Sequence, residues 1–184
     1  MSTPPELIAG SKWLCWALRH DPTAAGLVLD PQGWAELDDV LAAAARHDHP
    51  LTPAELKLIV TTSDKQRFAL SDDGRRIRAN QGHSVTVDLG LVPQVPPEVL
   101  YHGTAECFVA AILSEGLRRG ARQHVHLSAD QATASSVGVR HARLVLLTVA
   151  AARMHADRLP FFRSTNGVWL ADAVPPEYLA RLVL

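Results

Sequence analysis

Apolar side chains in the first part of the chain recur at helical spacing. Leu7, Leu14 and Leu18 fall on one face of a predicted helix, and an Asp-Pro pair at 21–22 ends it. A second amphipathic segment covers 37–47. Both segments are long enough for ordinary helices of a packed domain. The opening pattern therefore predicts a helical start to the chain.

The pattern then changes from helix to hairpin. Residues 52–55, Thr-Pro-Ala-Glu, combine a capping box with proline at the first helical position and predict a third helix. Two short extended runs in 67–79 flank an Asp-Asp-Gly turn, the usual signal for a hairpin. Three helices followed by a hairpin is the order of a winged helix, a relative of the helix-turn-helix.

The second half alternates strand and helix patterns after a proline-rich stretch at 88–98, which predicts an extended connector. Gly116 stands where a helix C-cap glycine belongs, and Thr104 is a candidate N-cap for the helix before it. The fold class is therefore α+β. We expect strands at 99–104, 124–128, 142–154 and 166–170, and helices at 105–115 and 129–138.

Composition narrows the function classes. The chain has 184 residues, a net charge of −1, and 15 Arg against 3 Lys, so a basic nucleic-acid coat is excluded while an arginine pocket for phosphate is not. Two cysteines make neither a disulfide framework nor a zinc site. The N-terminus lacks a secretory pattern, and the longest apolar run, 144–152, is too short to cross a membrane. We expect a cytoplasmic protein.

Three polar clusters in the first half are candidates for chemistry. Arg19 and His20 close the first helix, where the alternative is compensation of the helix dipole. Arg67 enters a partly buried strand and needs an anionic partner, for which an ion pair with Asp64 or Asp72 is the alternative. Residues 77–84 offer side-chain donors and a bare backbone for an anion, or are simply a polar loop.

Two more clusters lie in the second half. Residues 101–104, Tyr-His-Gly-Thr, stand at a strand-to-helix junction, where glycine lets a ligand approach the backbone. In 122–128, His124 and His126 alternate onto one strand face. A zinc site there lacks further ligands, so we expect no metal, and a pair of core-edge histidines is the alternative.

Taken together, six stretches resemble the RNA 2′-phosphotransferase (tRNA 2′-phosphotransferase) family, in the family's order and over nearly the whole chain. They are SKWLCWALRH, DKQRF, IRANQGHS, YHGT, RQHVHLS and STNGVWL. The resemblance implies a winged-helix-like RNA-binding lobe over 1–90, a linker over 91–98, and an ADP-ribosyltransferase-like NAD lobe over 99–184.

The resemblance also implies a reaction. Such enzymes take an internal 2′-monophosphate from RNA, in tRNA splicing and processing, and consume NAD⁺ without a metal. The phosphate displaces nicotinamide, and a ribose hydroxyl of the ADP-ribosylated RNA then attacks phosphorus. The products are 2′-OH RNA, nicotinamide and ADP-ribose 1″,2″-cyclic phosphate. The family's catalytic set falls on Arg19, His20, Arg67 and Arg122.

The NAD-binding pattern of the family falls on residues of the second half. The family's three-residue pattern of two histidines and one hydrophobic residue corresponds to His102, His126 and Val168. A hydrophobic residue in the last position, where many protein-modifying relatives have Glu, suits an acceptor that is already an anion. The cofactor-binding residues implied are His102, Gly103, Thr104, His126, Ser128, Asn166, Gly167 and Val168.

The implied roles agree with the chemistry of these side chains. Arginine forks bind a phosphate bidentately and stabilise charge that develops on phosphorus. Histidine is the natural acid–base group near neutral pH. Two alternatives stay open: an ADP-ribosyltransferase acting on terminal phosphates of nucleic acid or on a small phosphorylated acceptor, and a winged-helix regulator without chemistry. We expect a monomer without an obligate protein partner.

Overall fold

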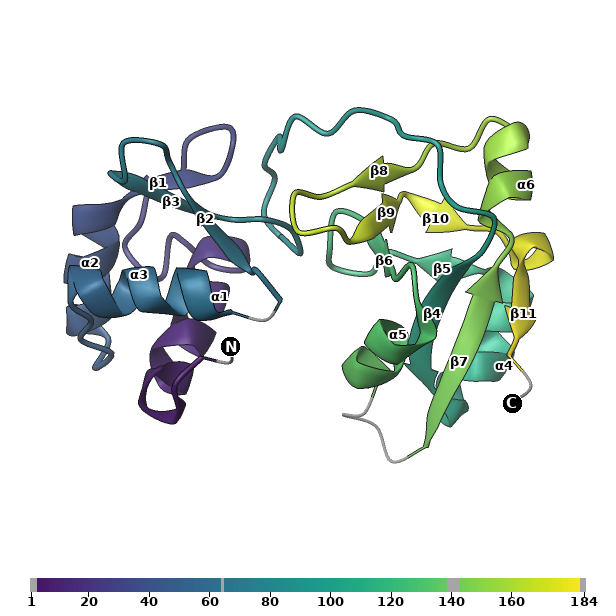
Figure 1. Cartoon of the computed structure of the whole chain (residues 1–184), viewed down its shortest axis with the longest axis horizontal. Coiled ribbons are helices and arrows are strands. Elements are labelled where there is room, and N and C mark those ends of the chain that lie inside the picture. Colours follow the sequence, from purple (N-terminus) through teal and green to yellow (C-terminus); the bar gives the residue numbers. More distant parts are fainter. Residues whose placement is uncertain (1–2, 64, 139–142, 183–184) are drawn as a thin grey trace. The chain divides into compact units, whose positions relative to one another are not determined.

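The computed structural model describes residues 3–63, 65–138 and 143–182, and it combines α-helices with small antiparallel sheets (Figure 1). Within these ranges there are six α-helices and two short 3₁₀ helices. The chain separates into two units, Met1–Gly90 and Leu91–Leu184. The mixture of helices and antiparallel sheets expected of an α+β protein is therefore present.

The first unit is three helices and one three-stranded sheet. Its fully buried side chains come from all of these elements and include Leu14 and Leu18 of the first helix and Ile77 of the sheet. In chain order the elements are η1 (Pro5–Leu7), α1 (Ile8–Arg19), β1 (Trp34–Glu36), α2 (Leu37–Arg46), α3 (Pro53–Thr62), β2 (Phe68–Leu70) and β3 (Arg76–Ala79).

Local sequence explains the boundaries of these elements. The capping box at the start of α3 is complete, because Thr52 accepts from the backbone N–H of Glu55 and the Glu55 carboxylate accepts from that of Thr52. The predicted hairpin is formed by β2 and β3, with Gly74 in the turn at φ +69°. Strand β1 pairs with the other side of β3, giving the order β1-β3-β2.

The second unit contains three small antiparallel sheets, ordered β11-β7-β4, β6-β9-β8 and β10-β5. Its buried side chains include Leu100, Leu127, Phe161 and Leu170. The elements are β4 (Leu100–Ala105), α4 (Glu106–Glu115), β5 (Leu117–Arg118), β6 (Val125–Leu127), α5 (Gln131–Gly138), β7 (Leu144–Val149), α6 (Ala151–Ala156), β8 (Phe162–Arg163), β9 (Trp169–Ala171), β10 (Ala173–Val174), η2 (Pro176–Tyr178) and β11 (Leu179–Arg181).

Two expectations about this unit are wrong. Thr104 does not cap α4; it pairs with Val145 inside the β4–β7 ladder and is buried, and the strand runs on to Ala105. The strand expected over 142–154 ends at Val149, because both neighbouring strands end opposite that residue and the alanine-rich segment beyond it forms α6. The part of that expectation at residue 142 lies outside the described residues.

The proline-rich segment is extended and packs against the second unit. Pro93 forms a β-bridge with Phe162, and the Gln94 backbone N–H donates to the Phe161 carbonyl at 2.9 Å. In the described part of the chain, every helix is too short or too polar to cross a membrane.

Candidate functional site

In the first unit, the end of α1 is tied to a loop more than sixty residues away. The Arg19 carbonyl accepts the backbone N–H of Ser84 at 2.9 Å, and the Ser84 hydroxyl lies 3.3 Å from the same oxygen. That hydroxyl is also 3.0 Å from Nδ1 of His20. With its proton donated to the carbonyl, the hydroxyl accepts from Nδ1–H, so His20 carries its lone pair on Nε2. Ser84 therefore orients the His20 ring.

Arg67 contacts Arg19, the last residue of α1, through its backbone. Arg19 Nη2 donates to the Arg67 carbonyl at 3.2 Å, and Arg67 Nη1 donates to the Ser63 hydroxyl at 3.1 Å. The Arg19 guanidinium lies 5.9 Å from the centre of the Phe68 ring. Gly82, at φ +89°, leaves room for that guanidinium, since a Cβ there would lie 3.4 Å from Arg19 Nη1. The Arg19 guanidinium is thus held against the backbone of Arg67, and the Arg67 guanidinium is held by Ser63.

His83 lies behind this cluster and is almost completely buried. Burial, reinforced by the positive charges of Arg19, His20 and Arg78, lowers the pKa of His83 to about 4. Neither ring nitrogen of His83 has a hydrogen-bond partner among the described residues. The groups that act on it electrostatically are all cationic or titrate to cations, so the loop at 82–84 is lined by positive charge.

In the second unit, β4, β6 and β9 pair into neighbouring strands that carry three of the motifs found in the sequence. Ser128, after β6, exchanges two backbone hydrogen bonds with Tyr101 of β4, each 2.9 Å long. His126 of β6 lies opposite Leu170 of β9. His102 Nδ1 is 3.1 Å from the His126 carbonyl, and a carbonyl only accepts, so Nδ1 carries the proton.

Burial favours the neutral forms of His102 and His124 by lowering the pKa of each. Burial lowers the pKa of His102, the hydrogen bond to the His126 carbonyl raises it, and the nearby Arg122 charge lowers it again, with burial the largest influence. The pKa of His124 is also lowered, mainly by burial. Arg122 Nη1 lies 3.3 Å from Nδ1 of His126. A guanidinium held beside these histidines suits a site that receives an anion.

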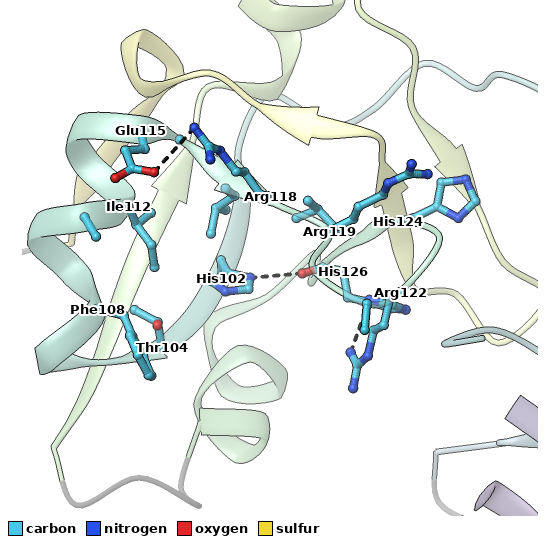
Figure 2. A pocket seen from close by; sticks show the side chains of 15 residues that line it. His102, Thr104, Phe108, Ile112, Glu115, Arg118, Arg119, Arg122, His124 and His126 are labelled. Carbon is cyan, nitrogen blue, oxygen red and sulfur yellow. Dashed lines mark hydrogen bonds and ion pairs between the residues drawn. The ribbon is translucent and has the colours of Figure 1, made fainter. Parts of the chain in front are cut away.

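A cavity of about 530 Å³ opens beside these residues, between α4 and the strands (Figure 2). Its wall combines an apolar side from α4 with arginine and histidine side chains, and Figure 2 shows His102, His126 and Arg122 grouped on one side of it. The volume lies in the range of small-molecule sites. The residues that line it include His102, Thr104, Phe108, Ile112, Glu115, Leu117, Arg118, Arg119, Arg122, His124, Val125 and His126.

The turn before β9 is held by a buried serine. Ser164 is buried, and its hydroxyl lies 2.7 Å from Asn166 Oδ1 and 3.0 Å from the Val168 carbonyl while it accepts the Val168 backbone N–H. Gly167 takes φ +82° at the tip of this turn. Asn166, Gly167 and Val168 therefore have a fixed backbone path directly before β9.

The structure brings the predicted site residues together in two groups. Arg19, His20 and Arg67 share one cluster of the first unit. Arg122 belongs to the second unit, with the cavity. His102, Thr104 and His126 line that cavity; Gly103 and Ser128 adjoin it in β4 and after β6, and the 166–168 turn does not line it. Asp64, one alternative partner of Arg67, lies outside the described residues.

Several site residues were missed by the sequence reasoning. The sequence marks residues 77–84 as a candidate anion-binding loop or a plain polar loop, but it does not connect Ser84 with His20. Arg118 and Arg119 follow a helix C-cap glycine and carry no local signal; only the fold turns them toward a cavity. Among the described residues, no three His, Cys, Asp or Glu side chains come together in a way that would hold a metal ion.

Comparison with known proteins identifies similar sequences. A sequence model described as "RNA 2′-phosphotransferase, Tpt1 / KptA family" matches residues 5–173. A protein of Agrobacterium fabrum, called a probable RNA 2′-phosphotransferase, is 57% identical over 171 residues, 93% of this chain and 92% of its own. Proteins with the same designation from Acaryochloris marina and Trichormus variabilis are 49% and 52% identical, covering 96% and 92% of this chain and 98% and 93% of theirs.

Proposed function

The chain belongs to the RNA 2′-phosphotransferase, Tpt1 / KptA family and is an RNA 2′-phosphotransferase, and from this premise we propose that it consumes NAD⁺ to remove an internal 2′-phosphate from RNA. The observation that carries the proposal is the cluster of Arg19, His20 and Arg67, with His20 oriented by Ser84. This arrangement suits a phosphate monoester next to a phosphodiester, which concentrates negative charge in a small volume.

The proposed reaction has two steps. A phosphate oxygen forms a bond to C1″ of the nicotinamide ribose as the bond to nicotinamide breaks. The 2″-hydroxyl then attacks phosphorus, and the bond from phosphorus to the RNA 2′-oxygen breaks. The hydroxyl loses a proton and the RNA 2′-oxygen gains one. The products are 2′-OH RNA, nicotinamide and ADP-ribose 1″,2″-cyclic phosphate.

Each residue of the catalytic set has a role in this proposal. Arg19 and Arg67 bind the phosphate oxygens and stabilise the charge that develops on phosphorus. Nε2 of His20 moves the proton in the second step, since its Nδ1 is engaged by Ser84. Arg122 is the fourth member of the catalytic set, and its place in the set rests on the family pattern.

The NAD⁺ site in this proposal is the cavity of the second unit. Its residues fit the dinucleotide in charge and in shape: arginines for the pyrophosphate and an apolar wall for a ring. His102, Gly103, Thr104, His126 and Ser128 would hold the nicotinamide-ribose end, and the turn at 166–168 would border it. When bound, NAD⁺ supplies an electrophilic carbon with a good leaving group.

The finer assignments follow from the same family membership. We propose that 1–90 is a winged-helix-like RNA-binding lobe and that 99–184 is an ADP-ribosyltransferase-like lobe. The three helices and hairpin of the first unit support the former. A role in tRNA splicing and processing, a cytoplasmic location and action as a monomer belong to the proposal.

The test combines NAD⁺ with a 2′-phosphorylated oligoribonucleotide and identifies the products by mass. We expect nicotinamide, 2′-OH RNA and ADP-ribose cyclic phosphate. If the RNA stays phosphorylated and no nicotinamide appears, the proposal is wrong. If the reaction stops at ADP-ribosylated RNA, or if 5′-phosphorylated ends are the preferred acceptor, the enzyme is an ADP-ribosyltransferase acting on phosphates instead.

Two variants test the roles in the cluster. His20→Ala removes the proton-transfer group, and we expect kcat to fall by roughly 10²–10⁴-fold. Ser84→Ala keeps the ring but loses its orienting partner, so we expect a smaller fall and an altered pH profile of kcat. Thr86→Ala, an exposed change two residues further on in the same loop, is the matched control.

A further inference from the structure

The outward face of the β1-β3-β2 sheet carries an aromatic and cationic group that the proposed reaction does not use. Trp34 of β1 lies directly opposite Arg78 of β3. The Arg78 guanidinium carbon is 4.6 Å from the centre of the Trp34 ring, and that of Arg76 is 5.6 Å from it. Both distances are within the range of cation–π contacts. The ring thus fixes two arginine side chains on one face of the sheet.

The two arginines differ in whether a carboxylate pairs with them. Arg76 Nη1 is 3.3 Å from the Asp30 carboxylate. Arg78 makes no ion pair and no side-chain hydrogen bond with any described residue, and its Nε is buried without a partner. Its cross-strand neighbours are Trp34 and Ala69, neither of which is an anion. Arg78 is therefore a half-buried positive charge that lies against the Trp34 ring, and among the described residues it has no carboxylate partner of its own.

Arg78 also lies near the cluster formed by Arg19, His20 and Arg67, since its charge and those of Arg19 and His20 act on the same buried side chain, His83. Strand β3 ends one residue later and leads directly into the loop that carries Gly82, His83 and Ser84. The charge of Arg78 acts on His83 together with those of Arg19 and His20. A chain of phosphates that crosses the cluster at Arg19 and His20 would meet the next fixed positive charge at Arg78.

We propose that Arg78, held against Trp34, binds a phosphodiester of the RNA backbone next to the nucleotide that carries the 2′-phosphate. This rests on the proposed function for the identity of the ligand. The ring limits the motion of the guanidinium, so less side-chain entropy is lost on binding than for a free surface arginine. The contact adds affinity for the strand and carries no base specificity, as is usual for backbone phosphates.

The experiment measures binding of a fluorescent oligoribonucleotide with and without a central 2′-phosphate, in the absence of NAD⁺, for three proteins. They are the wild type, Arg78→Met and the control Arg75→Met. Arg75 is exposed in the β2–β3 turn, so the control loses the same charge away from the Trp34 ring. We expect R78M to weaken binding of both RNAs roughly tenfold and to lower the salt slope by about one. We expect R75M to match the wild type within about twofold.

A second measurement locates the contact and does not depend on a variant that folds. In the 2′-phosphorylated RNA, one flanking phosphodiester at a time is replaced by a neutral methylphosphonate. We expect a methylphosphonate at one position to weaken RNA binding by the wild type about as much as the R78M substitution does. The same methylphosphonate should not weaken binding by R78M any further. For turnover, we expect R78M to raise KM and leave kcat unchanged.

The outcomes separate this proposal from the proposed function. Equal binding by R78M and R75M, or no sensitive linkage in the wild type, overturns the role of Arg78, which then only stabilises the sheet. If R78M does not fold and no methylphosphonate weakens binding by the wild type, Arg78 likewise only stabilises the sheet. If the wild type turns over no RNA while R78M still weakens binding of both oligonucleotides, the proposed function fails and the backbone contact stands.

Discussion

Lowering the pH should destabilise this protein in part through one buried histidine, His83. His83 has its pKa lowered to about 4 by burial and by the positive charges around it, against 6.5 for the free side chain. Between these two values the unfolded chain binds a proton at His83 that the folded chain does not bind. His83 therefore stabilises the fold fully above pH 6.5, and that stability is lost as the pH falls toward 4.

The size of the effect follows from the difference between the two values. A full shift from 6.5 to about 4 corresponds to about 3 kcal/mol, and about 2.5 kcal/mol of this is already lost at pH 4.5. A small domain is stable by about 5–15 kcal/mol, so the loss is a large part of the total. Other groups titrate over the same range, so the contribution of His83 must be isolated by a variant.

The assay is urea unfolding at pH 7.0 and 4.5 for the wild type and His83→Gln, which keeps a polar side chain that does not titrate. We expect the wild type to lose about 2.5 kcal/mol more between the two conditions than the variant. An NMR titration of the folded wild type reads the same pKa directly. Equal losses in both proteins, or a His83 resonance that titrates near 6.5, would refute the reasoning.

Three further changes have expected outcomes. Gly116→Ala should prevent stable folding or cost more than about 3 kcal/mol in urea unfolding, because the residue has φ +85° and a Cβ would collide with the Val174 carbonyl; a loss under 1 kcal/mol would contradict this. Gly82→Ala should lower the free energy of unfolding by about 1 kcal/mol, because the residue has φ +89°. Relief of that strain would shift the loop whose backbone touches the Arg19 guanidinium, so kcat/KM should fall by more than the stability change explains; unchanged turnover would contradict this. Ser164→Ala should lower the free energy of unfolding by about 1–3 kcal/mol, because it leaves buried polar groups without a hydrogen bond. It should also weaken NAD⁺ binding measured by calorimetry. An unaltered NAD⁺ affinity would show that this turn is not part of the NAD⁺ site.

Short-range chemistry explains why the helices and the hairpin of the first unit were predictable. The Thr52–Glu55 capping box and the turn at Gly74 are determined by residues within a few positions of each other. The same reasoning failed where an element's limit depends on its neighbours. Thr104 has the composition of a cap, but the β4–β7 ladder extends past it, and the apolar run after Val149 leaves the sheet because its partner strands end there.

The candidate site shows the same division more sharply. The sequence by itself determined the residue types suited to a phosphate and a dinucleotide, the order of the motifs and hence the family. Only the tertiary structure decided that Ser84 orients His20, that the His126 carbonyl sets the tautomer of His102, and that Arg78 rests on the Trp34 ring. These contacts join residues up to 64 positions apart, and their existence depends on how strands pair and loops return. Local propensity reports the conformation of a few residues at a time, whereas a site is made by side chains that only the packed chain brings within hydrogen-bond distance.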